Sequence, residues 1–331
     1  MKALVYTAPH TLAFRDEPDP VPANDEIVVK VAAVGVCGSD MHGYHGHDER
    51  RPAPLILGHE AAGIATGGRF EGKRVTINPL VTCMACDACL DGRPHLCPSR
   101  QILSLAPRPG AFAELVRIPE ANLIEVPAGF DIVKAALAEP MAVAYHAVEL
   151  GLSRSSRPQT SLRCGVLGGG AIGLASALVL AMAGVREIAV GEPNPARRKT
   201  VSRSGDFDAY EPGSSGEPKP GSLDLVLDAV GADATRAAAC RLVRPGGVIV
   251  HIGLLPGNGG IDIRRITLQE ITLVGTYCYT MVDFRETVAA LASGRLGALD
   301  WVEERPLQDG ARAFQDIDQG KVAAAKIILR P

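Results

Sequence analysis

The segment CGVLGGGAIG, from Cys164 to Gly173, constrains the fold of this chain more than any other feature. Its glycines Gly168, Gly170 and Gly173 have the spacing G-x-G-x-x-G and stand between an apolar, strand-like run and a helix-like run. Glycine at these positions permits a tight turn, close approach of the backbone to a pyrophosphate and close packing of the helix on the strand. The segment predicts a dinucleotide-binding unit, and a glycine turn selected only for packing is the alternative.

The sequence after Leu162 alternates strand patterns with helix patterns. We expect strands at 162–167, 187–191, 223–228, 247–252 and 271–276, and helices at 171–183, 195–203 and 232–243. Such alternation is typical of a doubly wound parallel sheet covered by helices, the α/β Rossmann arrangement. The segment 211–221, EPGSSGEPKPG, stands where a crossover helix is expected. Its proline and glycine content predicts a mobile surface loop there instead.

The cofactor site should extend beyond the glycines. Ala171 and Ile172 begin the helix whose free N–H groups would meet the phosphates, and Glu192 ends the second strand, where a carboxylate would bind the adenosine ribose. A carboxylate there favours NAD over NADP, although Arg197 and Arg198 leave NADP open because an arginine can neutralise a 2′-phosphate. The remaining cofactor contacts are expected from Val230, Gly253 and Tyr277, with Tyr279 as an alternative to Tyr277.

The first 135 residues have a different texture, with short β-branched runs separated by proline and glycine. This pattern predicts a β-barrel or sandwich, and the helical spacing that follows Leu137 marks a domain boundary. A chain of 331 residues is long enough for two domains. We expect a β-rich domain at 1–145, a dinucleotide-binding domain at 146–285 and a C-terminal segment, 286–331, that packs back on an existing domain.

Four cysteines, Cys83, Cys86, Cys89 and Cys97, form the pattern C-x2-C-x2-C-x7-C. Four thiolates can complete a tetrahedron around one zinc ion, as a structural site requires, and free or disulfide-bonded cysteines are the alternative. The segment carries two acids against one arginine and has no aromatic residue, and the net charge of the chain is -3, so we expect no nucleic-acid partner.

The uncharged stretch from Cys164 to Val185 has the length of a membrane span, but its glycines predict a strand, a turn and a helix instead. The N-terminal sequence MKALVYTAPHTLAFRDEPD lacks the pattern of a secretory signal. We therefore expect a cytoplasmic protein without a membrane partner.

A second set of candidate ligands is dispersed along the chain. It occupies three motifs, VCGSDMH with Cys37, Ser39, Asp40 and His42, LGHEAAG with His59 and Glu60, and LAEP with Glu139. A thiolate, an imidazole and a carboxylate would leave a fourth zinc position open for chemistry. The nearby His45 and His47 are interpreted as residues of a flexible loop rather than as a metal site.

Together CGSDMH, GHEAAG, the four-cysteine segment, AEPMAVAYHA and VLGGGAIG resemble, in order and separation, the zinc-dependent medium-chain alcohol dehydrogenases, in particular their polyol (sorbitol) and threonine dehydrogenase branch. The resemblance implies that 1–145 is a GroES-like β-barrel catalytic domain beside the Rossmann domain and that 286–331 returns to it, and it implies two zinc ions per chain and a homodimer or homotetramer. It implies roles for the dispersed residues: catalytic zinc ligands Cys37, His59 and Glu139; a carboxylate that orients the histidine, Asp40; an acid near the metal, Glu60; a proton relay, Ser39 and His42.

The function expected from this resemblance is hydride transfer from a secondary alcohol or polyol to NAD, giving a ketone. Tyr44 and Phe112 are candidates for the substrate pocket. Two alternatives remain open: an NADP-dependent reductase of aldehydes or ketones, and a non-catalytic redox sensor that binds zinc and a nucleotide.

Overall fold

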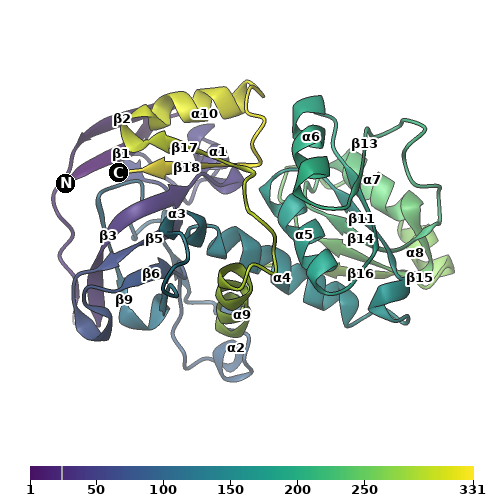
Figure 1. Cartoon of the computed structure of the whole chain (residues 1–331), viewed down its shortest axis with the longest axis horizontal. Coiled ribbons are helices and arrows are strands. Elements are labelled where there is room, and N and C mark those ends of the chain that lie inside the picture. The colour runs from purple at the N-terminus through teal and green to yellow at the C-terminus, as the bar shows by residue number, and fades with distance from the viewer. Residues whose placement is uncertain (24) are drawn as a thin grey trace. The chain divides into compact units, whose positions relative to one another are not determined.

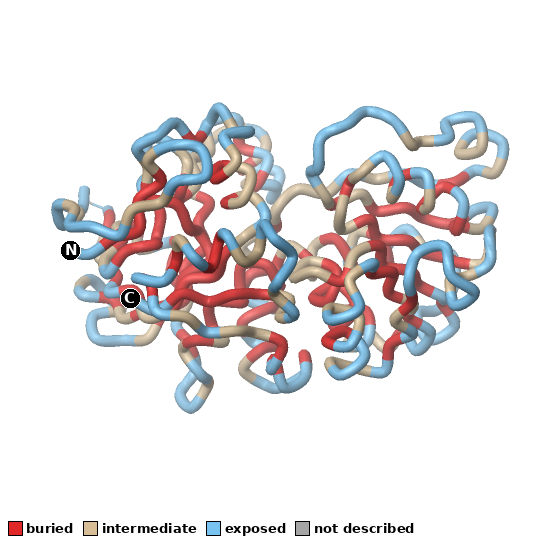
Figure 2. Tube along the Cα trace, turned by 90° about the horizontal axis from the view of Figure 1, so that it is seen from above, coloured by how far each residue is buried: buried red, intermediate tan, exposed pale blue. Residues whose placement is uncertain are grey.

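A computed structural model describes residues 1–23 and 25–331 and divides them into two compact units (Figure 1). Unit 1 comprises Met1–Glu139, Thr280–Ser293 and Val302–Pro331, and unit 2 comprises Pro140–Tyr279 and Gly294–Trp301. Each unit has its own buried interior, shown in red in Figure 2.

Unit 1 is built mainly from antiparallel strands. Its strands are β1 (Lys2–Ala8), β2 (Thr11–Asp16), β3 (Glu26–Gly35), β4 (Leu55–Ile56), β5 (Glu60–Ala65), β6 (Arg74–Ile77), β7 (Leu80–Val81), β8 (Gln101–Ile102), β9 (Leu115–Pro119), β10 (Leu123–Glu125), β17 (Val302–Pro306) and β18 (Lys326–Arg330). Its helices are α1 (Gly38–Tyr44), α2 (Asp87–Leu90), α3 (Ile132–Ala135), α9 (Met281–Ala292) and α10 (Gly310–Asp318).

The largest sheet of unit 1 has the order β10-β6-β5-β3-β18-β17, and β9 also pairs with β3. The C-terminal strand β18 lies antiparallel to β3, with Leu329 opposite Val34. This pairing brings the C-terminal strand into the same sheet as β3, and it sets which residues of β18 lie near the segment that follows β3.

The core of unit 1 contains Tyr44 and Phe112, which were candidates for the substrate pocket. Phe112 is fully buried with its ring edge-on to Phe314 at 5.8 Å, and Tyr44 packs on the same Phe314 ring at 5.4 Å. Burying a phenylalanine side chain contributes roughly 1.5–3 kcal/mol. These two aromatic residues therefore stabilise unit 1, and the proposed pocket role for them was wrong because their rings lie inside the core.

Unit 2 contains a parallel sheet over the described residues. Its strands are β11 (Arg163–Leu167), β12 (Glu187–Gly191), β13 (Asp208–Tyr210), β14 (Leu223–Asp228), β15 (Val243–His251) and β16 (Thr272–Gly275). Helix α4 (Ala138–Leu152) begins at the end of unit 1, and α5 (Ala171–Met182), α6 (Pro195–Ser204), α7 (Asp233–Leu242) and α8 (Ile263–Leu268) follow the strands.

The order β13-β12-β11-β14-β15-β16, with every pairing parallel, confirms the predicted doubly wound α/β sheet. The direction of winding reverses between β11 and β14, which is where ligands bind in such sheets. Strand β13 was not expected. From Glu211 to Ser222 the described chain forms no helix, as its proline and glycine content predicts. Within the residues described, no helix has the length and apolar character needed to cross a membrane.

Candidate metal and cofactor sites

The motif CGSD forms the start of helix α1 and fixes Cys37 there. Cys37 is the residue that caps the helix, and its backbone N–H donates to Oδ2 of Asp40 at 3.0 Å. The other oxygen of Asp40, Oδ1, accepts from the backbone N–H of Gly58 at 3.1 Å. Because Asp40 is fully buried, its two hydrogen bonds hold the CGSD and GHE segments together inside unit 1.

The ring of His59 is oriented by two neighbours. Its Nδ1 lies 3.6 Å from Oδ1 of Asp40 and 3.3 Å from Oγ of Ser104. Burial alone would lower the pKa of His59, but the Asp40 carboxylate more than offsets this and raises that pKa well above its usual value. A carboxylate beside one ring nitrogen leaves the other available for a metal, which is the usual support of a histidine ligand.

Cys37, His59 and Glu60 each offer a ligand atom, and these three atoms all lie within 4.8 Å of one another. Thiolate, imidazole and carboxylate are the donor types that zinc prefers. Oε2 of Glu60 is buried and has no hydrogen-bond partner within the described part of the chain. An unpartnered buried carboxylate oxygen beside a cysteine and a histidine fits a metal cation.

Glu139, the expected third ligand, lies in the first turn of α4 and is buried. The 4.8 Å cluster contains Glu60 in its place. Glu139 nevertheless acts electrostatically on Lys326, the same ammonium group that pairs with Glu60. The structure therefore places two carboxylates near one buried lysine.

Lys326, at the start of β18, was missed by the sequence reasoning. Its Nζ is 2.6 Å from Oε1 of Glu60 and donates to the carbonyl of Val36 at 3.0 Å. Burial lowers the pKa of Lys326, but Glu60 and Cys37 offset this and hold it above the usual value, so the lysine stays charged. The only sequence signal was one lysine within the apolar run VAAAKIIL.

Ser39 and His42 lie on α1 beside a second unexpected residue, Arg51. The buried guanidinium of Arg51 forms an ion pair with Asp48, and its Nη2 lies 3.4 Å from Oγ of Ser39. The same nitrogen lies 3.5 Å from Oγ of Ser104. Burial, and then the positive charge of Arg51, lower the pKa of His42, so its ring is held neutral at physiological pH.

The four-cysteine segment forms a compact lobe around α2. The sulfur atoms of Cys83, Cys86, Cys89 and Cys97 lie within 4.8 Å of one another, with Cys83 to Cys97 at 3.5 Å and Cys83 to Cys89 at 3.9 Å. A zinc ion bound at about 2.3 Å by four sulfurs requires sulfur separations of about 3.8 Å. Backbone N–H groups of Ala85 and Cys86 lower the pKa of Cys83 to about 6, which favours the thiolate. The lobe fits a structural zinc ion.

In unit 2 each of the three motif glycines has different surroundings, which explain why glycine stands at that position. Gly168 has φ +97°, and a Cβ there would meet Cγ2 of Val230 at 2.5 Å. A Cβ at Gly173 would meet the carbonyl oxygen of Gly168 at 1.8 Å, so only glycine lets α5 pack this closely. A Cβ at Gly170 would have open space around it among the described atoms. Gly170 caps α5, so Ala171 and Ile172 present backbone N–H groups at a helix start that is open to a phosphate.

Glu192 closes the glycine loop from the side. It is buried at the end of β12, where its Oε2 accepts from the N–H of Gly169 at 2.9 Å and its Oε1 from the N–H of Asn194 at 2.8 Å. Nε of Arg197 lies 3.4 Å from Oε1 of Glu192.

Arg198 donates to the carbonyls of Glu192 and Pro193 and forms an ion pair with the carboxylate of Glu211.

The remaining expected cofactor residues follow other strands of the sheet. Val230 follows β14 and Gly253 follows β15, and a Cβ at Gly253 would meet the carbonyl carbon of Val230 at 2.0 Å. The loops at these strand ends therefore pack backbone to backbone. Tyr277 is half-buried after β16, and Tyr279 is buried.

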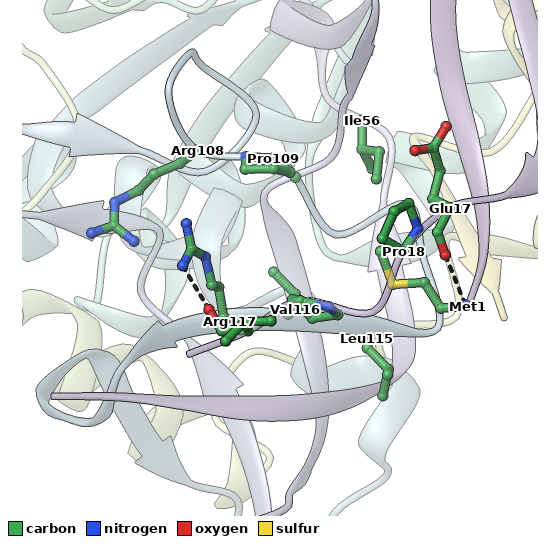
Figure 3. Close-up of a pocket in the computed structure, with 12 residues that line it drawn as sticks. Met1, Glu17, Pro18, Ile56, Arg108, Pro109, Leu115, Val116 and Arg117 are labelled. Atoms are coloured by element: carbon green, nitrogen blue, oxygen red, sulfur yellow. Dashed lines mark hydrogen bonds between the residues drawn. The ribbon is translucent and has the colours of Figure 1, made fainter. Parts of the chain in front are cut away.

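Unit 1 also contains a hollow of about 400 Å³ (Figure 3). Met1, Glu17 and Ile56 line it, together with Arg108 and Arg117. Both arginines are already engaged, Arg108 with Glu26 at 2.7 Å and Arg117 with the carbonyl of Val21 at 2.7 Å. Its described lining includes none of the expected ligand or relay residues, so this hollow is not the candidate site.

Comparison with known proteins agrees with this geometry. Residues 23–128 match the family model of the alcohol dehydrogenase GroES-like domain, and residues 171–293 match that of the zinc-binding dehydrogenases. The chain is 30% identical to L-galactonate-5-dehydrogenase of Escherichia coli (strain K12), over 90% of this chain and 89% of that protein. This chain belongs to the zinc-dependent medium-chain alcohol dehydrogenases.

Other members of the family support the assignment. Sorbitol dehydrogenase of Bacillus subtilis (strain 168) is 29% identical over 100% of this chain and 97% of its own length. A solved structure described as a zinc-binding dehydrogenase from Sinorhizobium meliloti 1021, bound to NADP, is 27% identical and superposes with a TM-score of 0.88 over 100% of this chain and 99% of that chain. The expectation of a dehydrogenase that uses zinc and a nicotinamide cofactor is confirmed.

Proposed function

We propose that this dehydrogenase oxidises a secondary hydroxyl group of a polyol to a ketone, with NAD as the hydride acceptor and two zinc ions per chain. The observation that carries the proposal is the cluster of Cys37, His59 and Glu60, because Cys37 caps the helix that carries Ser39 and His42. The relatives named as sorbitol and L-galactonate dehydrogenases support a polyhydroxylated substrate.

The metal-binding residues divide into permanent and mobile ligands in this proposal. Zinc, when bound, supplies a Lewis acid that makes the substrate hydroxyl easier to deprotonate. Cys37 and His59 hold it, and we assign the third ligand to Glu139 because one oxygen of Glu60 is already bonded to Lys326. Glu60 keeps one free oxygen, which lets it approach the metal without giving up the lysine.

Ser39 and His42 are proposed to carry the proton away from the substrate. The Ser39 hydroxyl accepts the proton, and His42 delivers it toward solvent because its lowered pKa keeps the imidazole neutral and able to accept. Arg51 lies 3.4 Å from the serine oxygen and repels a second positive charge at His42. The neutral ring of His42 can therefore take up the proton, and the nearby charge of Arg51 favours its release from the protonated ring.

The preference for NAD rests on Glu192. Its buried carboxylate places a negative charge at the end of β12, where the 2′-phosphate of NADP would be repelled. Arg197 is the observation that favours the second candidate, an NADP-dependent reductase, since its guanidinium lies beside that carboxylate and is partly exposed. Comparison of initial rates with NAD and NADP separates the two.

We also propose a homodimer or homotetramer. Strand β16 is an edge of the parallel sheet, and three of its four residues are exposed. Leu273 on this strand and Leu268 just before it are both exposed apolar residues. An unpaired, apolar edge favours pairing with a second copy, and analytical ultracentrifugation measures the assembly.

The decisive experiment combines a panel of alcohols and polyols, followed by the absorbance of the reduced nicotinamide, with zinc analysis of the same sample. Turnover of at least one polyol with two zinc ions per chain supports the proposal. A Ser39→Ala variant should keep both zinc ions and lose about 10²-fold or more in kcat. Tight nucleotide binding without turnover of any substrate would instead support the non-catalytic sensor.

A further inference from the structure

Unit 1 contains another group of potential ligands, outside the zinc sites described above. One ligand atom from each of His10, His45 and Asp318 lies within 4.8 Å of the other two. Nε2 of His45 is 2.7 Å from Oδ1 of Asp318, and the ring centroids of His10 and His45 are 5.1 Å apart. The interpretation of His45 as an ordinary loop residue was incomplete because its partners come from distant parts of the chain.

The three residues are mounted on segments that other contacts hold together. His10 lies in the turn between β1 and β2, His45 caps the C-terminal end of α1, and Asp318 is the last residue of α10. The backbone N–H of His10 donates to the carbonyl of Tyr44 at 2.6 Å. Tyr44 in turn packs on Phe314 of α10. The ligand positions are therefore fixed by the fold before any ion binds.

The local backbone is adapted to this close approach. His10 has φ +59°, a left-handed conformation that most side chains avoid. Gly46, which follows His45, has φ +75°, and a Cβ there would meet Cγ of Pro9 at 2.9 Å. A residue larger than glycine at position 46 would push the turn of His10 away from the end of α1.

We propose that His10, His45 and Asp318 bind one divalent transition-metal ion, such as zinc, nickel or copper, at a third site. Two imidazoles and one carboxylate are a donor set that these metals accept, with water completing the coordination. Ligands about 2.1 Å from an ion are about 3.4 Å from one another in a tetrahedral arrangement. Binding therefore requires the 2.7 Å distance between His45 and Asp318 to lengthen slightly, and the longest distance between two ligand atoms, which is at most 4.8 Å, to shorten. Side chains that are partly exposed can make both movements.

The third site lies at the other end of the helix that begins at Cys37. An α-helix rises about 1.5 Å per residue, so the two caps, Cys37 and His45, are about 12 Å apart along α1. An ion at the third site would tie the end of α1 to α10 and to the β1–β2 turn. This restrains the helix that carries Ser39 and His42.

The test is a calorimetric titration with Ni²⁺ of enzyme that holds two zinc ions per chain and has been freed of any further bound metal. We expect the wild type to bind one additional equivalent of Ni²⁺ per chain. The affinity for this equivalent should fall at least about tenfold in His10→Asn and in Asp318→Asn. Asparagine at position 10 tolerates the left-handed conformation, so that variant should fold. Glu49→Gln, which removes an exposed carboxylate of the same loop outside the cluster, is the matched control and should leave the equivalent unchanged.

A second readout identifies the ligands directly. Pulsed electron paramagnetic resonance of Cu²⁺ at this site should show two imidazole nitrogens in the wild type and one in His10→Asn. The proposal is overturned if the wild type binds no further equivalent, or if that equivalent survives unchanged in both ligand variants. Neither outcome depends on catalysis, so the proposed function is tested separately.

Discussion

Replacing Lys326 with methionine tests the charge balance of the catalytic cluster. Methionine nearly matches the length of the lysine stem and removes only the ammonium group. That group is buried, pairs with Oε1 of Glu60 at 2.6 Å and donates to the carbonyl of Val36 at 3.0 Å. The change therefore leaves a fully buried carboxylate without its cation and one buried carbonyl without its donor.

The expected cost follows from that geometry. Removing one partner of a buried ion pair destabilises the folded state by about 3–5 kcal/mol, because the remaining charge stays buried. The same strand offers a matched control, since Arg330 of β18 pairs with Glu304 at 3.0 Å with both side chains about half exposed. Arg330→Met should cost less than about 1 kcal/mol, as exposed ion pairs do.

Native-state hydrogen exchange at the amides of β3 and β5 is the suitable assay, because a chain with two units and bound metals does not give a single unfolding free energy. A loss of 3–5 kcal/mol accelerates exchange from about 150-fold to several thousand-fold. The double variant with Glu60→Gln removes both charges and should exchange more slowly than Lys326→Met alone. If the double variant loses as much free energy of opening as the two single variants lose in sum, the ion-pair argument is refuted.

Three further predictions concern other parts of the protein. Gly170→Ala should keep its thermal stability but bind NAD more weakly, whereas Gly173→Ala should lose both thermal stability and NAD affinity. A melting curve and a fluorescence titration of each variant measure the two properties. Cys97→Ser should reduce the metal content by one zinc ion per chain in elemental analysis, and an unchanged content would exclude the four-sulfur site. Arg51→Met removes a cation that disfavours protonation of His42, so the pKa of His42 should rise and the acid limb of the kcat/KM profile should move to higher pH; a shift to lower pH would contradict the assigned electrostatics.

Features encoded by short-range spacing could be predicted from the sequence. The four cysteines share one short segment, so their spacing alone restricts how the sulfurs can be arranged, and the structure places them within 4.8 Å of one another. The predicted strands and helices of unit 2 are present to within a few residues, except that β15 starts earlier, at Val243, and β13 and α8 were not predicted. These features depend on backbone conformation and apolar periodicity over a few residues, which the sequence displays directly.

The environment of the catalytic cluster could not be predicted in this way. Lys326 reaches Glu60 only because β18 pairs with β3, and Arg51 and Ser104 reach Ser39 and His59 through irregular segments. A sequence pattern gives the partners of such residues no local signal, since the contacts join positions far apart in the chain.

The sequence by itself determined the two classes of domain, the glycine turn and the grouping of the four cysteines, because each depends on residue type and local spacing. Tertiary structure alone decided that Glu60 is paired with a buried lysine and that His45 meets His10 and Asp318. Both outcomes depend on strand register and helix packing, which bring distant side chains to within a few ångströms only after the whole unit has folded.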